Sequence, residues 1–316
     1  IDSQVHFREP GATHKADLAT ESRAALVGGI TSFFDMPNTK PQTVTCEALE
    51  DKFTMAAGRA WGNYAFYLGA TNGNIEDIRR LQPNQTCGIK VFMGASTGNM
   101  LVDSPATLEQ IFRDAPTLVS THCEDTPTIQ ANENLYREKY GDEIPVRYHP
   151  LIRSEEACWL SSSMAVDLAK QYDTRLHVLH LTTAKEMALF QAGPVQGKRI
   201  TAEACVHHLY FSEEDYTQRG SFIKCNPAIK TTADRAALRQ ALVEDRIDVL
   251  ATDHAPHTLE EKQQSSYFAT PAGLPLVQYA LCMALQLVDE GVLSLPQAVH
   301  KMSHAPALMF GIAERG

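Results

Sequence analysis

Residues 247–257, IDVLATDHAPH, contain a short apolar run that ends at Asp253 and is followed by His254 and His257. A run of this length between polar residues is typical of a buried β-strand. A carboxylate at the end of such a strand can bind a metal ion and exchange a proton with water. An isolated aspartate in this position can also simply cap the next helix, so the rest of the chain must decide between the two roles.

Seven similar runs precede this one, and stretches with helical periodicity separate them. The predicted strands are 1–7 (IDSQVHF), 30–36 (ITSFFDM), 63–70 (NYAFYLGA), 87–93 (CGIKVFM), 117–123 (TLVSTHC), 175–182 (RLHVLHLT), 199–206 (RITAEACV) and 247–253 (IDVLATD). Helical patterns include 14–29 with its stop at Gly28 and Gly29, 107–114, 154–172 and 232–245, then 274–291 and 295–311 after the last strand. This alternation implies parallel strands with crossover helices, and eight strands favour a closed barrel. The predicted fold class is α/β, a (β/α)8 barrel of the TIM type.

Length and composition fit one domain that covers residues 1–316. A chain of 316 residues with 44% hydrophobic and 21% charged residues can fill the core of a single barrel. The gaps at 124–152 and 209–232 are long, and we expect elaborated loops there, above or beside the rim. The chain opens without Met, inside an apolar run at Ile1, so we expect further residues upstream.

Charge and cysteine usage restrict the partners. The formal net charge of -10 argues against nucleic acid or an anionic membrane as a partner, although a cleft can still attract a small anionic substrate. The sequence contains no apolar run long enough to span a bilayer. Seven scattered cysteines without a C-x-x-C pair fit a reducing compartment, and we expect a cytoplasmic protein.

The first strand carries polar side chains on one face. Gln4, His6 and Arg8 alternate along the run, so they point in the same direction. A lone histidine in a strand is more often a core residue than a metal ligand. The arginine on the same face and the following Pro10 and Gly11 favour a site at this strand end.

Lys90 lies in the middle of an apolar strand. Desolvation of an ammonium group lowers its pKa and leaves the amine partly neutral. A neutral amine can react with carbon dioxide, and the carbamate that forms has two oxygens able to bridge two cations. The alternative is a lysine that extends from the strand end to solvent.

Histidines end the fifth and sixth strands. Neutral imidazole is a common zinc ligand, and His122 and His180 both lie near C-terminal strand ends. We expect His177, earlier in its strand, to be structural. Because the C-terminal ends of barrel strands meet at one rim, five side chains should converge there: His6, Lys90, His122, His180 and Asp253. Together they predict a metal-centred hydrolytic site.

The segments around these residues resemble the motifs of dihydroorotases, in the same order and over nearly the whole chain. They are 2–11, 35–39 (DMPNT), 122–125 (HCED), 201–203 (TAE) with 207–209 (HHL), and 252–257 (TDHAPH). Each motif is shared with other cyclic amidohydrolases such as hydantoinases and allantoinases, but the combination with Arg8 and Asn38 is more restrictive. The resemblance implies a zinc-containing amidohydrolase barrel that interconverts N-carbamoyl-L-aspartate and L-dihydroorotate in pyrimidine biosynthesis.

The resemblance also implies a role for each site residue. His6, Lys90 and Asp253 would hold one zinc ion, and carboxylated Lys90 would hold a second with His122 and His180. Asp253 would be the catalytic residue, which takes a proton from the attacking water and returns it to the departing ring nitrogen. The implied substrate-binding residues are Arg8 and Asn38 for the substrate carboxylate, His257 on the opposite wall, and Asn226 beside the ring.

One position departs from the family pattern. The opening motif usually has two histidines separated by one residue, and the first of them is Gln4 here. An amide oxygen is a poor zinc ligand, so we expect one or two zinc ions, with the site of His122 and His180 filled first.

Two other functions remain open. The protein could be a non-catalytic scaffold for a partner enzyme such as a carbamoyltransferase, because one ligand is lost. It could also be a hydantoinase-like or allantoinase-like enzyme, because these enzymes share the metal set. Arg8 distinguishes a dihydroorotase from these other enzymes if it binds the substrate carboxylate. The alternative is that Arg8 only forms a salt bridge with Glu9 or another carboxylate at the rim.

The resemblance bears on assembly as well. Related barrels often pair, so we expect a homodimer. The resemblance also implies a small β-domain built from both ends of the chain, and we expect that domain to be missing from this sequence.

Overall fold

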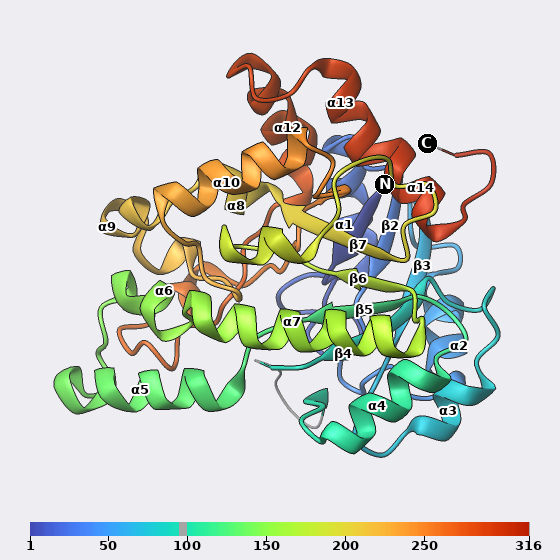
Figure 1. Cartoon of the computed structure of the whole chain (residues 1–316), viewed down its shortest axis with the longest axis horizontal. Coiled ribbons are helices and arrows are strands. Elements are labelled where there is room, and N and C mark those ends of the chain that lie inside the picture. The colour runs from blue at the N-terminus through green and yellow to red at the C-terminus, as the bar shows by residue number, and fades with distance from the viewer. Residues whose placement is uncertain (95–99, 316) are drawn as a thin grey trace.

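The computed structural model describes residues 1–94 and 100–315, and a ring of eight parallel strands lies at its centre (Figure 1). The strands are β1 (Asp2–Val5), β2 (Ser32–Asp35), β3 (Asn63–Gly69), β4 (Gly88–Phe92), β5 (Val119–His122), β6 (Leu176–Val178), β7 (Ile200–Cys205) and β8 (Val249–Ala251). Their order in the sheet is their order in the chain. All eight predicted strands are therefore confirmed, and each is shorter than the apolar run that predicted it.

The first and last strands meet and nearly close the barrel. Val5 forms a parallel bridge with His254, and the backbone N–H of His6 donates to the carbonyl oxygen of His254 at 2.7 Å. The predicted (β/α)8 class is confirmed. Closure brings residues that directly follow β1 and β8 side by side, although about 250 positions separate them in the chain.

Helices connect the strands and cover the outside of the barrel (Figure 1). They are α1 (Leu18–Val27), α2 (Cys46–Ala56), α3 (Ile75–Arg80), α4 (Pro105–Asp114), α7 (Glu155–Tyr172), η3 (Lys185–Leu189) and α10 (Thr232–Val243). The predicted stop of the first helix is confirmed: α1 ends at Gly28, and Gly29 has a φ of +79°. Asp17 begins this helix by accepting hydrogen bonds from two backbone N–H groups of its first turn.

The two long gaps are largely helical, so the prediction of elaborated loops is wrong for them. They contain α5 (Thr126–Tyr140), η2 (Val146–Tyr148) and α6 (His149–Ile152), then α8 (Val206–Tyr210), η4 (Glu213–Asp215), α9 (Tyr216–Arg219) and η5 (Gly220–Ile223). Ile129 is the only buried residue of α5, so the helix has too few apolar positions to show a clear helical period. This helix and its neighbours form a small separate core with Ile144, Ile152 and Tyr267.

The helices after β8 are α11 (Leu259–Lys262), η6 (Val277–Tyr279), α12 (Ala280–Asp289), α13 (Leu295–Val299), η7 (His300–His304) and α14 (Ala305–Phe310). The last two cover the N-terminal end of the barrel. The α-amino group of Ile1 donates to the carbonyl oxygen of Met302, and the guanidinium of Arg175, just before β6, donates to that of Met309. Because both contacts involve the beginnings of strands, this end is covered and the C-terminal strand ends remain available. Among the described residues, no helix is both long and apolar enough to cross a bilayer.

Candidate functional site

A cavity of about 950 Å³ opens at the C-terminal ends of the strands. It is lined by all nine residues that the sequence singled out: His6, Arg8, Asn38, Lys90, His122, His180, Asn226, Asp253 and His257. They come from five strand ends and from the loops that follow the strands. The barrel therefore brings the predicted site residues to one place.

His6 and Asp253 form the first pair. The His6 Nε2 atom lies 3.1 Å from Asp253 Oδ1, and its Nδ1 atom lies 2.8 Å from Asn38 Oδ1. An amide oxygen can only accept, so His6 donates from Nδ1, and this contact turns its Nε2 atom towards the Asp253 carboxylate, the other candidate ligand. Asn38 thus orients this imidazole, in addition to the contact with substrate that the sequence suggests.

Gln4 contacts the same carboxylate oxygen of Asp253. Its Nε2 atom donates to Asp253 Oδ1 at 3.0 Å, and its Oε1 atom lies 4.0 Å from the Cys205 Sγ atom. The amide therefore presents a donor, not a ligand oxygen, to the atoms of this site. A metal ion held by His6 and Asp253 would have one protein ligand fewer than the usual family pattern provides.

His122 and His180 form the second pair. The His122 Nδ1 and His180 Nε2 atoms lie 3.0 Å apart, and the His122 Nε2 atom lies 2.8 Å from Glu124 Oε2. Arg153 donates to the same carboxylate oxygen at 2.5 Å. Burial alone would raise the pKa of Glu124, but Arg153 and His122 together lower it to about 2. The carboxylate therefore accepts the proton on His122 Nε2, which leaves the Nδ1 lone pair directed at His180.

This second pair fits a zinc ion. Two nitrogens bound to tetrahedral zinc at about 2.0 to 2.1 Å are separated by roughly 3.3 Å. The observed 3.0 Å separation is close to that value. Burial lowers the pKa of both imidazoles, so both are neutral at physiological pH and able to bind a cation.

Lys90 lies in β4, and its side chain is buried. Its side chain is 1% exposed, and Nζ lies 4.5 Å from the centre of the Phe92 ring. The alternative of a lysine extended to solvent is therefore wrong. Desolvation lowers the pKa of the Lys90 ammonium to about 8, although Asp253 and Glu203 oppose this shift. A pKa of about 8 leaves roughly one tenth of the amine neutral at pH 7, and neutral amine is the chemical condition for carboxylation.

Three site residues have unusual backbone conformations. Arg8, His180 and Asp253 have φ angles of +67°, +37° and +49°. A left-handed conformation costs a non-glycine residue on the order of 1–3 kcal/mol, and such residues cluster at functional sites. Asp253 is also not a helix cap, because Thr258 caps α11, the next helix. The capping alternative for Asp253 is wrong.

Cationic groups gather at one side of the cavity. Arg8 donates from Nε to the carbonyl oxygen of Pro256 at 3.0 Å, and its terminal nitrogen lies 3.0 Å from His257 Nε2. His257 is therefore beside Arg8, and its expected position on the opposite wall is wrong because the β8–α11 loop folds back over the end of β1. Burial and the charges of Arg8 and Lys15 lower the pKa of His257 to about 3, so this imidazole is neutral.

Arg8 has no carboxylate partner among the described residues. Glu9, the neighbour proposed as its salt-bridge partner, pairs instead with both terminal nitrogens of Arg59, at 2.7 and 3.1 Å. Asn226 also lines the cavity, and its buried Oδ1 atom accepts no hydrogen bond within the described part of the chain. A guanidinium and a free amide oxygen are thus both available to a bound molecule.

The sequence analysis missed three residues that shape the site. Glu124 orients His122, and it stood inside the HCED segment that was matched as a motif. Lys15 and Glu261 line the cavity and lie within 3.1 Å of each other beside His257. No sequence signal marks this pair, because the contact joins the loop after β1 to α11, which lie far apart in the chain.

The chain is similar to known proteins over its whole length. The chain is 32% identical to the dihydroorotase of Halobacterium salinarum over its whole length and covers 72% of that protein. It is 29% identical to the allantoinase of Bacillus velezensis, of which it covers 70%. Among solved structures, the L-hydantoinase (dihydropyrimidinase) from Arthrobacter aurescens superposes with a TM-score of 0.92 at 26% identity, over 99% of this chain and 71% of that one.

The family assignment rests on the whole chain. The sequence profile described as the Amidohydrolase family matches residues 1–316, which includes every residue of the cavity wall. A match to one isolated motif would not show that the barrel and the site residues belong to the same family. Because the match spans the eight strands and the relatives align along the same length, the chain belongs to the amidohydrolase family.

Proposed function

We propose that the protein is a zinc-dependent cyclic amide hydrolase that interconverts N-carbamoyl-L-aspartate and L-dihydroorotate. Membership of the amidohydrolase family supports hydrolysis of a carbon–nitrogen bond, and the 32% identity to dihydroorotases supports this substrate pair. One observation carries the proposal further than similarity. The same cavity holds imidazole and carboxylate side chains suited to a metal ion and an Arg8 guanidinium without a carboxylate partner among the described residues.

The cavity provides ligands for two ions. His122 and His180 would bind one ion, His6 and Asp253 the other, and a carboxylated Lys90 would be shared between them. Bound zinc would supply Lewis acidity and lower the pKa of water. The His122 and His180 nitrogens already face each other at 3.0 Å, and their site has all its family ligands, so we propose that it fills first.

Asp253 is the residue proposed to move the proton. Burial alone would raise its pKa, but the His6 side chain lowers it below the usual value for aspartate. Asp253 is therefore a carboxylate at neutral pH and can act as a base. It takes a proton from the attacking water and delivers it to the ring nitrogen as the amide bond breaks, so that the carboxyl group is regenerated as a carboxylate.

Arg8 and Asn226 are proposed to orient the substrate. A guanidinium can bind a carboxylate through two parallel N–H donors, and the exocyclic carboxylate of dihydroorotate matches that geometry. The unpaired Oδ1 atom of Asn226 can accept a hydrogen bond from a ring N–H group. His257 and Asn38 complete the predicted contacts. A cleft of this kind attracts a small anion even though the whole chain has a formal net charge of -10.

A different cyclic ureide remains a second candidate. The allantoinase of Bacillus velezensis is 29% identical over the whole chain, and the Arthrobacter aurescens structure is a hydantoinase. Metal ligands do not separate these enzymes from dihydroorotases. The carboxylate of the substrate does separate them, so the choice between these substrates depends on whether Arg8 binds that carboxylate.

A non-catalytic scaffold is favoured by one observation, the amide of Gln4 at Asp253. The hydrogen bond of 3.0 Å engages the oxygen that a metal ion would use. If this contact prevents metal binding at His6 and Asp253, the protein would retain the fold without turnover.

We also propose that the protein is a homodimer in the cytoplasm. Light scattering of the purified protein tests its assembly.

The experiment compares purified wild-type protein with Arg8→Ala and with Arg113→Ala, a surface control. The substrates are dihydroorotate, allantoin, hydantoin and dihydrouracil, which lacks the carboxylate, and zinc content is measured in parallel. Loss of one charge-assisted hydrogen-bonding partner should lower kcat/KM for dihydroorotate by about 10- to 100-fold, with unchanged zinc content and little effect on dihydrouracil.

Two results would contradict the proposal. Equal turnover of dihydroorotate by wild type and Arg8→Ala would reject the substrate assignment. Zinc-loaded wild-type protein that opens none of the four rings would favour the scaffold.

A further inference from the structure

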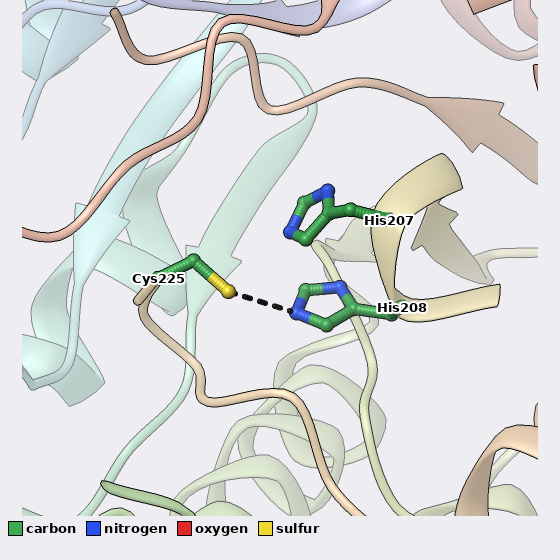
Figure 2. A group of neighbouring side chains, drawn as sticks. All are labelled: His207, His208 and Cys225. Atoms are coloured by element: carbon green, nitrogen blue, oxygen red, sulfur yellow. Dashed lines mark hydrogen bonds between the residues drawn. The ribbon is translucent and has the colours of Figure 1, made fainter. Parts of the chain in front are cut away.

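Three side chains behind the cavity wall point towards one another: His207, His208 and Cys225 (Figure 2). All three are buried, and each offers one ligand atom within 4.8 Å of the other two. None of them lines the cavity that holds the proposed active site. The group is therefore separate from the metal ligands described above.

The fold brings the three side chains together from two segments. His207 and His208 lie in the first turn of α8, directly after β7, and their ring centres are 3.9 Å apart. Cys225 lies in the segment between η5 and α10, and its Sγ atom is 3.7 Å from His208 Nε2 (Figure 2). The carbonyl oxygen of Pro227 lies 3.1 Å from His208 Nε2 and 3.3 Å from Cys225 Sγ.

The imidazoles of this group have unused polar atoms. Within the described residues, neither ring nitrogen of His207 has a hydrogen-bond partner, and neither does His208 Nδ1. Buried polar atoms are normally paired, so three unpaired nitrogens on two adjacent rings require an explanation. Burial lowers the pKa of His207 to about 4, so this ring is neutral and has a lone pair available.

The spacing matches a zinc site with sulfur and nitrogen ligands. Zinc–sulfur and zinc–nitrogen bonds of about 2.3 and 2.0 to 2.1 Å, at the tetrahedral angle, separate the two ligand atoms by roughly 3.6 Å. The observed distance between Cys225 Sγ and His208 Nε2 is 3.7 Å. The Pro227 carbonyl oxygen lies close to both atoms and offers a fourth donor.

We propose that His207, His208 and Cys225 bind a zinc ion in a further, sulfur-containing site. Binding releases the Cys225 thiol proton, which now points to the Pro227 carbonyl oxygen. The proton on His208 moves from Nε2 to Nδ1, which has no hydrogen-bond partner among the described residues. Both imidazoles stay neutral, so one proton leaves for each ion bound and no redox change occurs.

Such an ion would hold part of the cavity wall in place. Cys225 directly precedes Asn226, which lines the cavity, and the Cys225 carbonyl oxygen accepts a hydrogen bond from His149 Nε2 at 2.8 Å. A bond from zinc to Cys225 and another to His208 would tie this segment to α8. We infer that the ion is structural and that it positions Asn226.

Cobalt titration tests the site directly, because a thiolate ligand gives Co²⁺ a charge-transfer absorption that imidazole and carboxylate ligands do not. The metal-free protein is titrated in a Cys282→Ser background, since Cys282 is the exposed thiol. The expected result is a charge-transfer band that saturates at one equivalent at this site and is lost in Cys225→Ser. The matched control is Cys158→Ser, because Cys158 and Cys225 are both 1% exposed.

A second variant keeps the thiol. His207→Asn should weaken cobalt binding to this site at least about 10-fold while the absorption band remains detectable at high Co²⁺. X-ray absorption of the zinc-loaded protein should show sulfur at about 2.3 Å from zinc, and Cys225→Ser should remove it. Absence of the cobalt band and of zinc–sulfur scattering at saturating metal would overturn the proposal, and so would a band that survives in Cys225→Ser.

Discussion

Replacement of Lys52 by Met should remove a buried charge pair that supports the first two strands. Lys52, on α2, is 2% exposed and its ammonium contacts Asp35 Oδ2 at the end of β2. The other carboxylate oxygen of Asp35 accepts the backbone N–H of Phe7 at 2.8 Å, between the site residues His6 and Arg8. The variant leaves Asp35 charged, buried and without its cation.

The expected cost is large because the partner cannot reach water. Asp35 is 0% exposed, and the Lys52 ammonium has a second acceptor in the carbonyl oxygen of Met36 at 3.2 Å. Removal of one partner from a buried pair costs about 3–5 kcal/mol. With an unfolding entropy of about 2.1 cal/mol/K per residue, that loss lowers Tm by roughly 5–8 °C for a chain of this length.

Denaturant titration and calorimetry of four proteins measure the effect: wild type, Lys52→Met, Asp35→Asn and the double variant. The double variant should be more stable than Lys52→Met, because a neutral amide no longer needs a cation. Lys185→Met is the control, since Lys185 pairs with Glu156 at the surface and should change stability by less than about 1 kcal/mol. A Lys52→Met protein whose free energy of unfolding lies within about 1 kcal/mol of the wild-type value would refute this account of Asp35.

The site itself supports three further predictions. Gln4→His should replace the donor at Asp253 by a ligand and raise the affinity of the weaker zinc site at least about 10-fold, as measured by zinc retention against a chelator; equal retention would contradict this. Desolvation lowers the pKa of Lys90 to about 8, and only the neutral amine reacts with carbon dioxide, so zinc uptake by metal-free protein at equal concentrations of dissolved carbon dioxide should be faster at pH 9 than at pH 7. A pH-independent rate would argue against carboxylation. Glu124→Ala should leave the His122 Nε2 proton without its acceptor and weaken zinc binding by about 10- to 100-fold, and a titration with unchanged affinity would show that Glu124 does not orient this ligand.

The strands could be predicted because their pattern is local. Each strand is buried on both sides, so it appears in the sequence as an apolar run between helical stretches. The same reasoning fails at α5, where Ile129 is the only buried residue and a helix therefore resembles a loop. Its stability comes from contacts with distant residues such as Tyr267, which a local pattern cannot contain.

The site residues could be predicted for a different reason: parallel strands of a barrel end at the same rim. This rule placed His6, Lys90, His122, His180 and Asp253 together without any information about distance. It does not specify how the loops cross above the rim. The position of His257 beside Arg8 and the contact between Lys15 and Glu261 both depend on such crossings, so the first was wrongly placed and the second was missed.

Several features that cost free energy of folding lie near the C-terminal ends of the strands. Arg8, His180 and Asp253 have left-handed backbones, and buried polar atoms of His180, His207 and Asn226 have no partner among the described residues. Each of these features opposes folding, and none improves packing. A chain under selection for stability alone would lose them through ordinary substitution. Their presence together near the C-terminal strand ends is best explained if bound metal ions and substrate supply the missing partners, since binding to the folded state alone then stabilises it.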